Sequence, residues 1–225
     1  MGAIVGAAWL CGAIDALEEI ARAMSWRKLL AYADPRLGRS GGLFRGEAIM
    51  RELVRHLGRR MIEDLPAPFC AVAADLVSGE EVWFREGALE FAVRASIGVP
   101  GVFHPVSHHR HLLADGGLLN PVPVTAARSL GDGLVVAIDV MGDYGGRARA
   151  AGVETGAPTG PISGAEPDLE IKSPSWLGRA KGPGFAGIAT LSFALIMRKL
   201  AESNRRLAPP DVQIVPAIGH ISPLD

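Results

Sequence analysis

The chain has 225 residues, about the size of one domain, and 48% of them are hydrophobic, which is enough to fill a substantial core. With 23 Lys and Arg against 24 Asp and Glu, the net charge is −1, so no broad basic surface indicates nucleic acid or an anionic membrane as a partner. The two cysteines, Cys11 and Cys70, lie in apolar surroundings. We expect them to be reduced and buried, as in a cytoplasmic protein.

The first predicted element is a buried helix over the uncharged run from Gly2 to Ile14. Small residues recur along this run at near-helical spacing, as in a helix pressed against a sheet. The run is too short to cross a bilayer, which takes roughly 20 apolar residues. Asp15, Glu18 and Glu19 follow it directly, which is not typical of a signal peptide.

A literal G-x-S-x-G pattern lies at Gly38 to Gly42, with Ser40 in the position of a nucleophile. A nucleophile elbow needs a buried strand directly before the serine and a helix directly after it. The residues before this pattern, from Asp34 onward, are instead a polar loop that contains a proline. We therefore expect that Ser40 is not the nucleophile.

Residues 47 to 60 place apolar side chains at helical spacing with charges between them, which predicts an amphipathic helix. The charged side chains of this helix are Arg51, Glu52, Arg55, Arg59 and Arg60. We interpret the charged face as solvated surface, with recruitment to lipid head groups as the alternative.

Two strands are predicted at Phe69 to Leu76 and Glu81 to Arg85, joined by a turn at Ser78-Gly79. Asp75 precedes this turn, where an aspartate typically caps backbone N–H groups rather than acting in catalysis. A short helix is predicted from Glu86 to Ser96.

Four histidines, His104, His108, His109 and His111, come next. Structural zinc sites use four spaced ligands, whereas three of these histidines are crowded together without a nearby cysteine or second carboxylate. We interpret the segment as a solvated loop and predict no metal site.

A short apolar run, Leu112 to Ala114, leads directly to Asp115, which is followed by Gly116 and Gly117. This order predicts a carboxylate at the end of a strand. Glycine has no Cβ and tolerates positive φ, so the pair permits close approach of other backbone, as at a catalytic or ligand-facing site.

The next predicted element is a helix that runs to Leu130, capped by Asn120 and opened by a proline. The β-branched run from Gly133 to Val140 predicts a strand buried on both faces. Its Asp139 is interpreted as structural, because the glycine pair belongs to Asp115.

Residues 142 to 183 are rich in Gly, Ala and Pro without periodicity and are predicted to form a flexible loop. An apolar core helix over Phe185 to Met197 and a last strand over Val212 to Val215 complete the chain. This order of strands and helices predicts an α/β fold with a mostly parallel central sheet.

Several segments, in this order and spacing, resemble the patatin-like phospholipases, and more closely the bacterial branch related to neuropathy target esterase. They are MGAIVGAAWLCGAIDAL (1–17), SGGLFRGEAI (40–49), PFCAVAADLVSGEEVWF (68–84), RAS (94–96), PGVF (100–103), DGGLLNPVPV (115–124) and VVAIDV (135–140). The resemblance implies a three-layer patatin-like fold in which residues 1–225 form a single domain.

Met1 and Gly2 match the last two positions of the family's G-x-S-x-G elbow. The resemblance therefore implies that the nucleophilic serine directly precedes Met1. It also implies that the first strand and the glycine-rich oxyanion loop lie upstream, and that a closing helix lies beyond Asp225.

The resemblance further implies a Ser-Asp dyad without histidine, in which Asp115 accepts the serine proton and Gly116 and Gly117 let the substrate-bearing backbone come close. The implied substrate is a lipid acyl ester, either phospholipid or lysophospholipid, hydrolysed without a metal or other cofactor. A cytoplasmic protein that contacts a membrane surface is expected, with no nucleic acid as partner. The oligomeric state is left open.

Two other interpretations stay open. The first is a catalytically inactive fragment that binds lipid or a protein partner, because the nucleophile and the oxyanion loop supply interactions that no other residue replaces. The second is a serine hydrolase with a Ser40, Asp115 and His220 triad, which follows the chain order of α/β-hydrolases.

Overall fold

The computed structural model describes residues 1–23, 42–44, 47–143 and 185–218. Its helices are α1 (Gly2–Leu10), α2 (Ile14–Ala23), α4 (Glu47–Leu57), α5 (Leu89–Ser96), α6 (Val124–Arg128) and α8 (Phe185–Leu207), with short 3-10 helices η1 (Ile62–Asp64) and η2 (Gly116–Leu118). Its strands are β1 (Gly42–Phe44), β2 (Ala71–Asp75), β3 (Glu81–Phe84), β4 (Gly101–Phe103), β5 (Val106–His108), β6 (His111–Asp115), β7 (Val136–Ile138) and β8 (Val212–Ile214).

The largest sheet has the strand order β3-β2-β6-β5, and every pair in it is antiparallel. The prediction of a mostly parallel central sheet is therefore wrong for this sheet. The reason lies in the connections. A tight turn joins β2 to β3 through Gly79, whose φ is +76°, and another joins β5 to β6 through His109, whose φ is +52°. Such short turns can link only antiparallel strands.

Parallel pairing occurs in two smaller sheets, β1 with β4 and β7 with β8. In each pair the chain between the two strands includes helices, as a parallel connection requires. The α/β class is confirmed in this mixed form.

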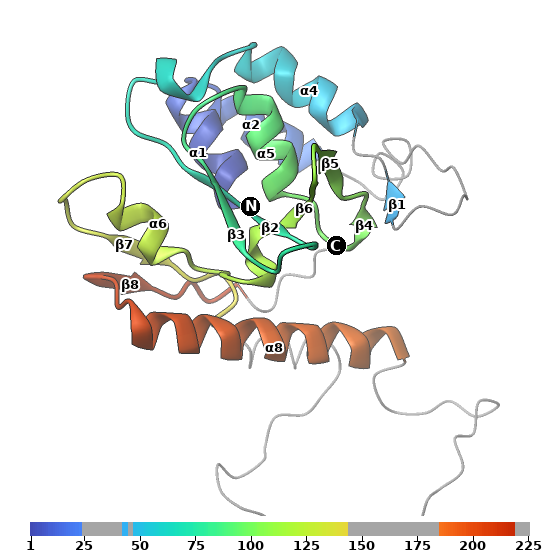
Figure 1. Cartoon of the computed structure of the whole chain (residues 1–225), viewed down its shortest axis with the longest axis vertical. Helices are drawn as coiled ribbons and strands as arrows, with labels where there is room; N and C mark the ends of the chain where they lie inside the picture. The colour runs from blue at the N-terminus through green and yellow to red at the C-terminus, as the bar shows by residue number, and fades with distance from the viewer. Residues whose placement is uncertain (24–41, 45–46, 144–184, 219–225) are drawn as a thin grey trace, which may run out of the picture.

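Helices α1, α2, α4 and α5 gather on one side of the four-stranded sheet (Figure 1). The core on this side contains Ala7 and Ala8 of α1, Ala71 of β2, and Leu89 and Val93 of α5. All five residues of β2 are buried. This strand is therefore the centre of the packed part of the fold.

The first helix is shorter than predicted, because the chain turns at Gly12, whose φ is +69°, and begins α2 at Ile14. Only Ala7 and Ala8 of α1 are buried, and Trp9 is 68% exposed. The expectation of a helix buried along its length is wrong, because only one face of α1 contacts the core.

Helix α8 lies along the opposite side of the molecule, next to β7 and β8 (Figure 1). Its Ala201 packs against Val135 and Ala137. The other face of β7 is open, with Val136 53% and Ile138 61% exposed. The prediction of a strand buried on both faces is thus wrong within the described residues.

The last helix is also less buried than its apolar composition predicts. Ala194, Met197 and Ala201 are buried on one face of α8, whereas Phe193 is 45% and Ile196 is 60% exposed on others. The helix continues past the apolar run to Leu207, with Arg205 and Arg206 in its last turn. It is a helix with one packed face, not a core helix.

Other predicted elements are confirmed with small shifts in their ends. Helix α4 stops at Leu57, because Gly58 has a φ of +71°. Strands β2, β3 and β8 and helix α5 lie within their predicted ranges. The loop predicted over residues 142 to 183 lies almost wholly outside the described residues.

The predicted cap at Asn120 is wrong. Helix α6 begins at Val124, with Pro123 as its N-cap and no side-chain capping bond. Asn120 instead points its amide at Glu81 of β3.

The histidine segment forms a hairpin rather than a loop, since His108 ends β5 and His111 begins β6. Both cysteines are free, as predicted, but half-buried rather than buried. Desolvation raises the pKa of the Cys11 and Cys70 thiols. Within the described ranges, no helix is long and apolar enough to span a membrane.

Candidate functional site

Asp115 is the last residue of β6, where the strand passes into η2. Its backbone N–H donates to the carbonyl of Gly98 over 3.0 Å, and its register partner on β2 is Ala73. The Oδ1 atom of Asp115 accepts a 2.7 Å hydrogen bond from the backbone N–H of Gly117. The carboxylate is therefore the side-chain cap of η2, half-buried and held in one orientation.

Gly116 lies against the central strand. A Cβ added at this position would sit 2.3 Å from the carbonyl oxygen of Val72 and 2.7 Å from its carbonyl carbon. The backbone that comes close to Gly116 in this structure is that of β2. At Gly117 a Cβ would sit 3.0 Å from Oδ1 of Asp115, so this glycine leaves room for the carboxylate itself.

The segment after the glycines is tied down on both sides. The backbone N–H of Asn120 donates to the carbonyl of Gly116 over 2.9 Å. Its side-chain Nδ2 donates to Oε1 of Glu81 over 3.0 Å. From α8, Nδ2 of Asn204 donates to the carbonyl of Leu119 over 2.9 Å. The turn that carries Asp115 is thus fastened to both β3 and α8.

Helix α1 packs at the end of the sheet where Asp115 emerges. Because β2 and β6 are antiparallel with Ala73 opposite Asp115, the start of β2 extends past the end of β6. Ala71 at that start belongs to the same core cluster as Ala7 and Ala8 of α1. A Cβ at Gly6 would lie 3.3 Å from the ring of Phe69, just before β2. The helix that begins at Gly2 is therefore a neighbour of this sheet end.

Asp75, the last residue of β2, is a second acid in this sheet, but both of its carboxylate oxygens accept hydrogen bonds. It is 2% exposed and accepts hydrogen bonds from Nδ1 of His111 at 2.9 Å and from the backbone N–H of Leu112 at 3.0 Å. Val77 N and Ser78 Oγ also donate to it, at 3.1 and 2.8 Å. These bonds, first that from His111, hold the pKa of the Asp75 carboxyl well below its ordinary value. The predicted capping role is confirmed.

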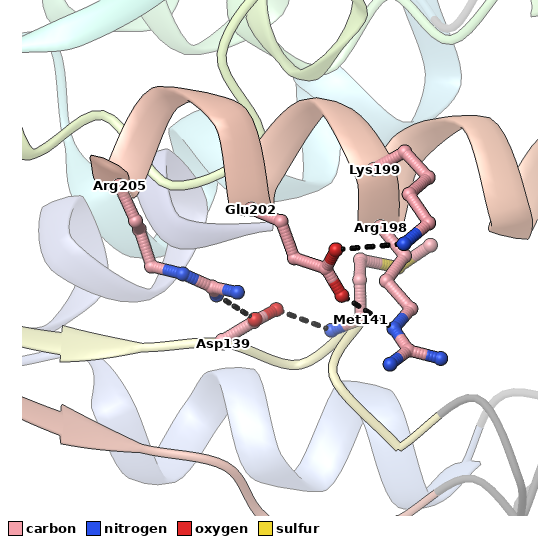
Figure 2. Close-up of polar contacts among 6 residues, drawn as sticks. All are labelled: Asp139, Met141, Arg198, Lys199, Glu202 and Arg205. Atoms are coloured by element: carbon pink, nitrogen blue, oxygen red, sulfur yellow. Dashed lines mark hydrogen bonds and ion pairs between the residues drawn. The ribbon is translucent and has the colours of Figure 1, made fainter. Parts of the chain in front are cut away.

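Asp139 follows β7 and is 1% exposed. Figure 2 shows its carboxylate between Arg205 of α8, with which it forms an ion pair, and the backbone N–H of Met141, which donates over 3.0 Å. On the same helix, Glu202 accepts hydrogen bonds from Arg198 and Lys199, each at 3.0 Å. The partners of Asp139 support its interpretation as a structural residue.

Comparison with known proteins decides the family. A sequence model of the family described as "Patatin-like phospholipase" matches residues 1–128, more than half of the 225 residues. The chain belongs to the patatin-like phospholipase family. The predicted resemblance is thereby confirmed.

Relatives of this patatin-like chain include proteins named as members of the NTE family. An uncharacterized NTE family protein of Mycobacterium tuberculosis is 38% identical over 151 residues, which cover 67% of this chain and 42% of that protein. A second one from the same organism is 39% identical over 143 residues, 62% of this chain and 24% of that protein. The mouse patatin-like phospholipase domain-containing protein 6 is 34% identical over 125 residues, 53% of this chain and 9% of that protein. The chain thus spans less than half the length of these relatives.

Part of the predicted site lies outside the residues that the structure describes. Ser40 and His220, two members of the alternative triad, lie outside the described residues. Across the described ranges, no three His, Cys, Asp or Glu side chains are placed to share a metal ion. Asp115, Gly116 and Gly117 are brought together as one turn.

Sequence reasoning missed two residues that hold this turn, Glu81 and Asn204. They lie 39 and 85 positions from the residues they bind, on a strand and on a helix, and no local pattern links them. The only usable signal was Asn120, an asparagine next to a proline, which also fits an ordinary helix cap.

Proposed function

We propose that this protein is a lipid acyl hydrolase of the serine esterase type, in which Asp115 accepts the proton of the nucleophilic serine. The proposal is supported by family membership and by one structural observation. Asp115 stands at a strand end with one carboxylate oxygen oriented by Gly117. Within the described residues, the Oδ2 atom of Asp115 accepts no hydrogen bond, so it is the oxygen available to a serine hydroxyl.

In the proposed reaction the serine oxygen attacks the acyl carbonyl of a phospholipid or lysophospholipid while its proton passes to Asp115. The alcohol part leaves, and water then attacks the acyl-enzyme and releases the fatty acid. Asp115 takes a proton in each attack and returns it to the leaving group. Backbone N–H groups of a glycine-rich loop stabilise the oxyanion. Neither a metal nor another cofactor takes part.

We place the serine directly before Met1 in the natural protein, on the basis of the elbow resemblance at Met1 and Gly2. This placement is supported by the packing of α1 at the sheet end that carries Asp115. A serine at the start of a helix is close to the positive end of the helix dipole, which favours a developing anion.

We also propose that residues 1–225 belong to one three-layer patatin-like domain. The family match ends at residue 128, but the later elements contact the earlier ones directly. Asn204 of α8 donates to the carbonyl of Leu119, and the Arg85 guanidinium donates to Ser129 Oγ over 2.7 Å.

A membrane surface is the proposed place of action. Beside α4 lies a hollow of about 510 Å³, lined by Met50, Arg51, Val54, Arg55, Arg59 and Glu90. The Arg55 side chain is 73% exposed. Arginines around an apolar floor suit anionic lipid head groups.

The deciding experiment measures lysophospholipid hydrolysis by the natural protein that contains this chain. Asp115→Asn keeps the acceptor for Gly117 but cannot take a proton, so kcat should fall by about 10²- to 10⁴-fold with the fold intact. Asp132→Asn, at an exposed aspartate, is the matched control. Full activity in Asp115→Asn would refute the assignment. Lipid binding without hydrolysis by the unaltered protein would favour the inactive-fragment alternative.

A further inference from the structure

A small cavity of about 160 Å³ lies between β3, the segment after η2, and the end of α8. Its polar lining comes from Glu81, Asn120, Thr125 and Asn204, and its apolar lining from Val122, Val124, Leu207 and Ala208. The carboxylate of Asp115 is not part of its lining. The proposed hydrolysis makes no use of the cavity.

The amide of Asn120 has a defined orientation in this cavity wall. Its Nδ2 faces Oε1 of Glu81 at 3.0 Å, and a carboxylate can only accept, so the nitrogen must be the atom on that side. The Oδ1 atom is therefore fixed as well. Asn120 is 7% exposed, and its Oδ1 is buried without a hydrogen-bond partner among the described residues. A buried acceptor of this kind costs stability unless something donates to it.

The side chains of Asn204 and Glu81 also present acceptor oxygens, whereas the Thr125 hydroxyl can either donate or accept. Asn204 uses its Nδ2 to donate to the carbonyl of Leu119, which leaves its Oδ1 as an acceptor. Glu81 accepts from Asn120 on Oε1 and from Trp83 Nε1 on Oε2 at 2.7 Å, and each oxygen keeps a further lone pair. In the part of the chain that the structure describes, no Lys, Arg or His forms an ion pair with Glu81. The cavity thus combines a negative charge with unused acceptors.

We propose that this cavity binds a primary ammonium ion on a short alkyl or hydroxyalkyl stem. An R–NH₃⁺ group has three donors and one positive charge. These match the oxygens of Glu81, Asn120 and Asn204, while the stem contacts Val122 and Val124. A volume of about 160 Å³ suits a small ligand. We expect a metal ion to bind this cavity less favourably than an ammonium group, because the apolar wall supplies no further oxygen ligands to replace its water shell.

The test is a titration of the protein with ethanolamine hydrochloride at constant ionic strength, followed by thermal melting. We expect a saturable rise in melting temperature. Two controls lack one property each: ethylene glycol has a similar size without charge, and tetramethylammonium has the charge without N–H donors. Neither should raise the melting temperature. A rise with all three compounds, or with none, would overturn the proposal, and the second result would mean that water fills the cavity.

Matched variants locate the site. Glu81→Gln is isosteric and still accepts from Asn120, but it removes the charge, so ethanolamine binding should weaken tenfold or more. Glu80→Gln makes the same charge change on the exposed neighbour and should bind as the unaltered protein does. The side-chain amide resonances of Asn120 and Asn204 should shift during the titration. Unchanged affinity in Glu81→Gln, or unperturbed amides, would contradict the site.

A last arm of the experiment separates two sources of the same chemistry. If the ammonium group belongs to a lipid, vesicles of phosphatidylethanolamine will compete with free ethanolamine, whereas phosphatidylglycerol vesicles will not. If the ligand is a free amine, neither vesicle will compete. This experiment measures binding, so an absence of ethanolamine binding would not contradict the proposed hydrolysis. Loss of hydrolysis in Asp115→Asn would likewise not contradict the ammonium site.

Discussion

The carbonyl oxygen of Val72 lies 2.3 Å from the point where Gly116 would carry a β-carbon. Real Cβ atoms do not approach backbone oxygen so closely, so β2 and the turn after Asp115 can pack together only while residue 116 is glycine. The first glycine of the pair is thus required by the central strand, one residue away from the proposed catalytic base.

Gly116→Ala is therefore expected to lower the free energy of unfolding by about 2–3 kcal/mol, because β2 or the turn must shift. Urea unfolding measures this change. Gly131→Ala is the matched control, since a Cβ there meets nothing within 4 Å. Equal stability of the two variants would show that the turn can move away from β2 at little cost.

The acid-stability profile should depend on Asp75. The pKa of its carboxyl is lowered in the folded protein, chiefly by the hydrogen bond with His111. Its contribution to stability is therefore complete above the unfolded pKa of about 3.9, and is lost as the pH falls further toward the folded pKa.

Asp75→Asn is accordingly expected to lower the melting temperature at pH 7 and to narrow the difference from the unaltered protein below pH 4. Thermal melts across this range measure it, with Asp132→Asn as an exposed control. A difference that stays constant down to pH 2 would mean that the Asp75 charge contributes nothing.

The ion pair between Asp139 and Arg205 joins β7 to α8 (Figure 2). The two side chains are 2% and 15% exposed, so Arg205→Met leaves a buried carboxylate without its cation and should cost about 3 kcal/mol or more in unfolding free energy. The double variant Asp139→Asn with Arg205→Met should lose less than Arg205→Met alone. Arg206→Gln, at an exposed position, should change little. If the double variant is less stable than Arg205→Met alone, the ion pair is not what stabilises the contact between β7 and α8.

Ser40→Ala separates the proposed dyad from the alternative triad. We expect hydrolysis by the natural protein to be unchanged, because the sequence before Ser40 lacks the apolar strand pattern that a nucleophile elbow requires. The measurement is kcat on a lysophospholipid. A loss on the order of 10⁴-fold or more would mark Ser40 as the nucleophile and bring His220 back as its base.

The arginines beside the α4 hollow should set membrane affinity. Arg55→Glu with Arg59→Glu should weaken sedimentation with phosphatidylglycerol vesicles by tenfold or more, since each basic residue near the surface contributes about 1 kcal/mol. Lys199→Glu with Arg206→Glu, both at exposed positions of α8, makes the same change in charge away from the hollow. If both variants lose the same binding, the attraction is general and α4 is not the docking face.

Local signals in the sequence determined the elements that depend on local chemistry. The turn at Ser78-Gly79, the amphipathic period of α4 and the acid before two glycines each depend on residues a few positions apart. For that reason the β2–β3 hairpin, helix α4 and Asp115 at a strand end were all predictable, and family resemblance followed from the same short motifs.

Only the tertiary structure decided which surfaces meet. The antiparallel pairing of β6 with β2, the contact of Gly116 with Val72, and the amide of Asn120 on Glu81 join residues some 40 positions apart. Apolar composition likewise could not tell that Ile138 faces outward while Ala137 packs on α8. A side chain's partner and exposure depend on the packing of distant segments, and no local period encodes that packing.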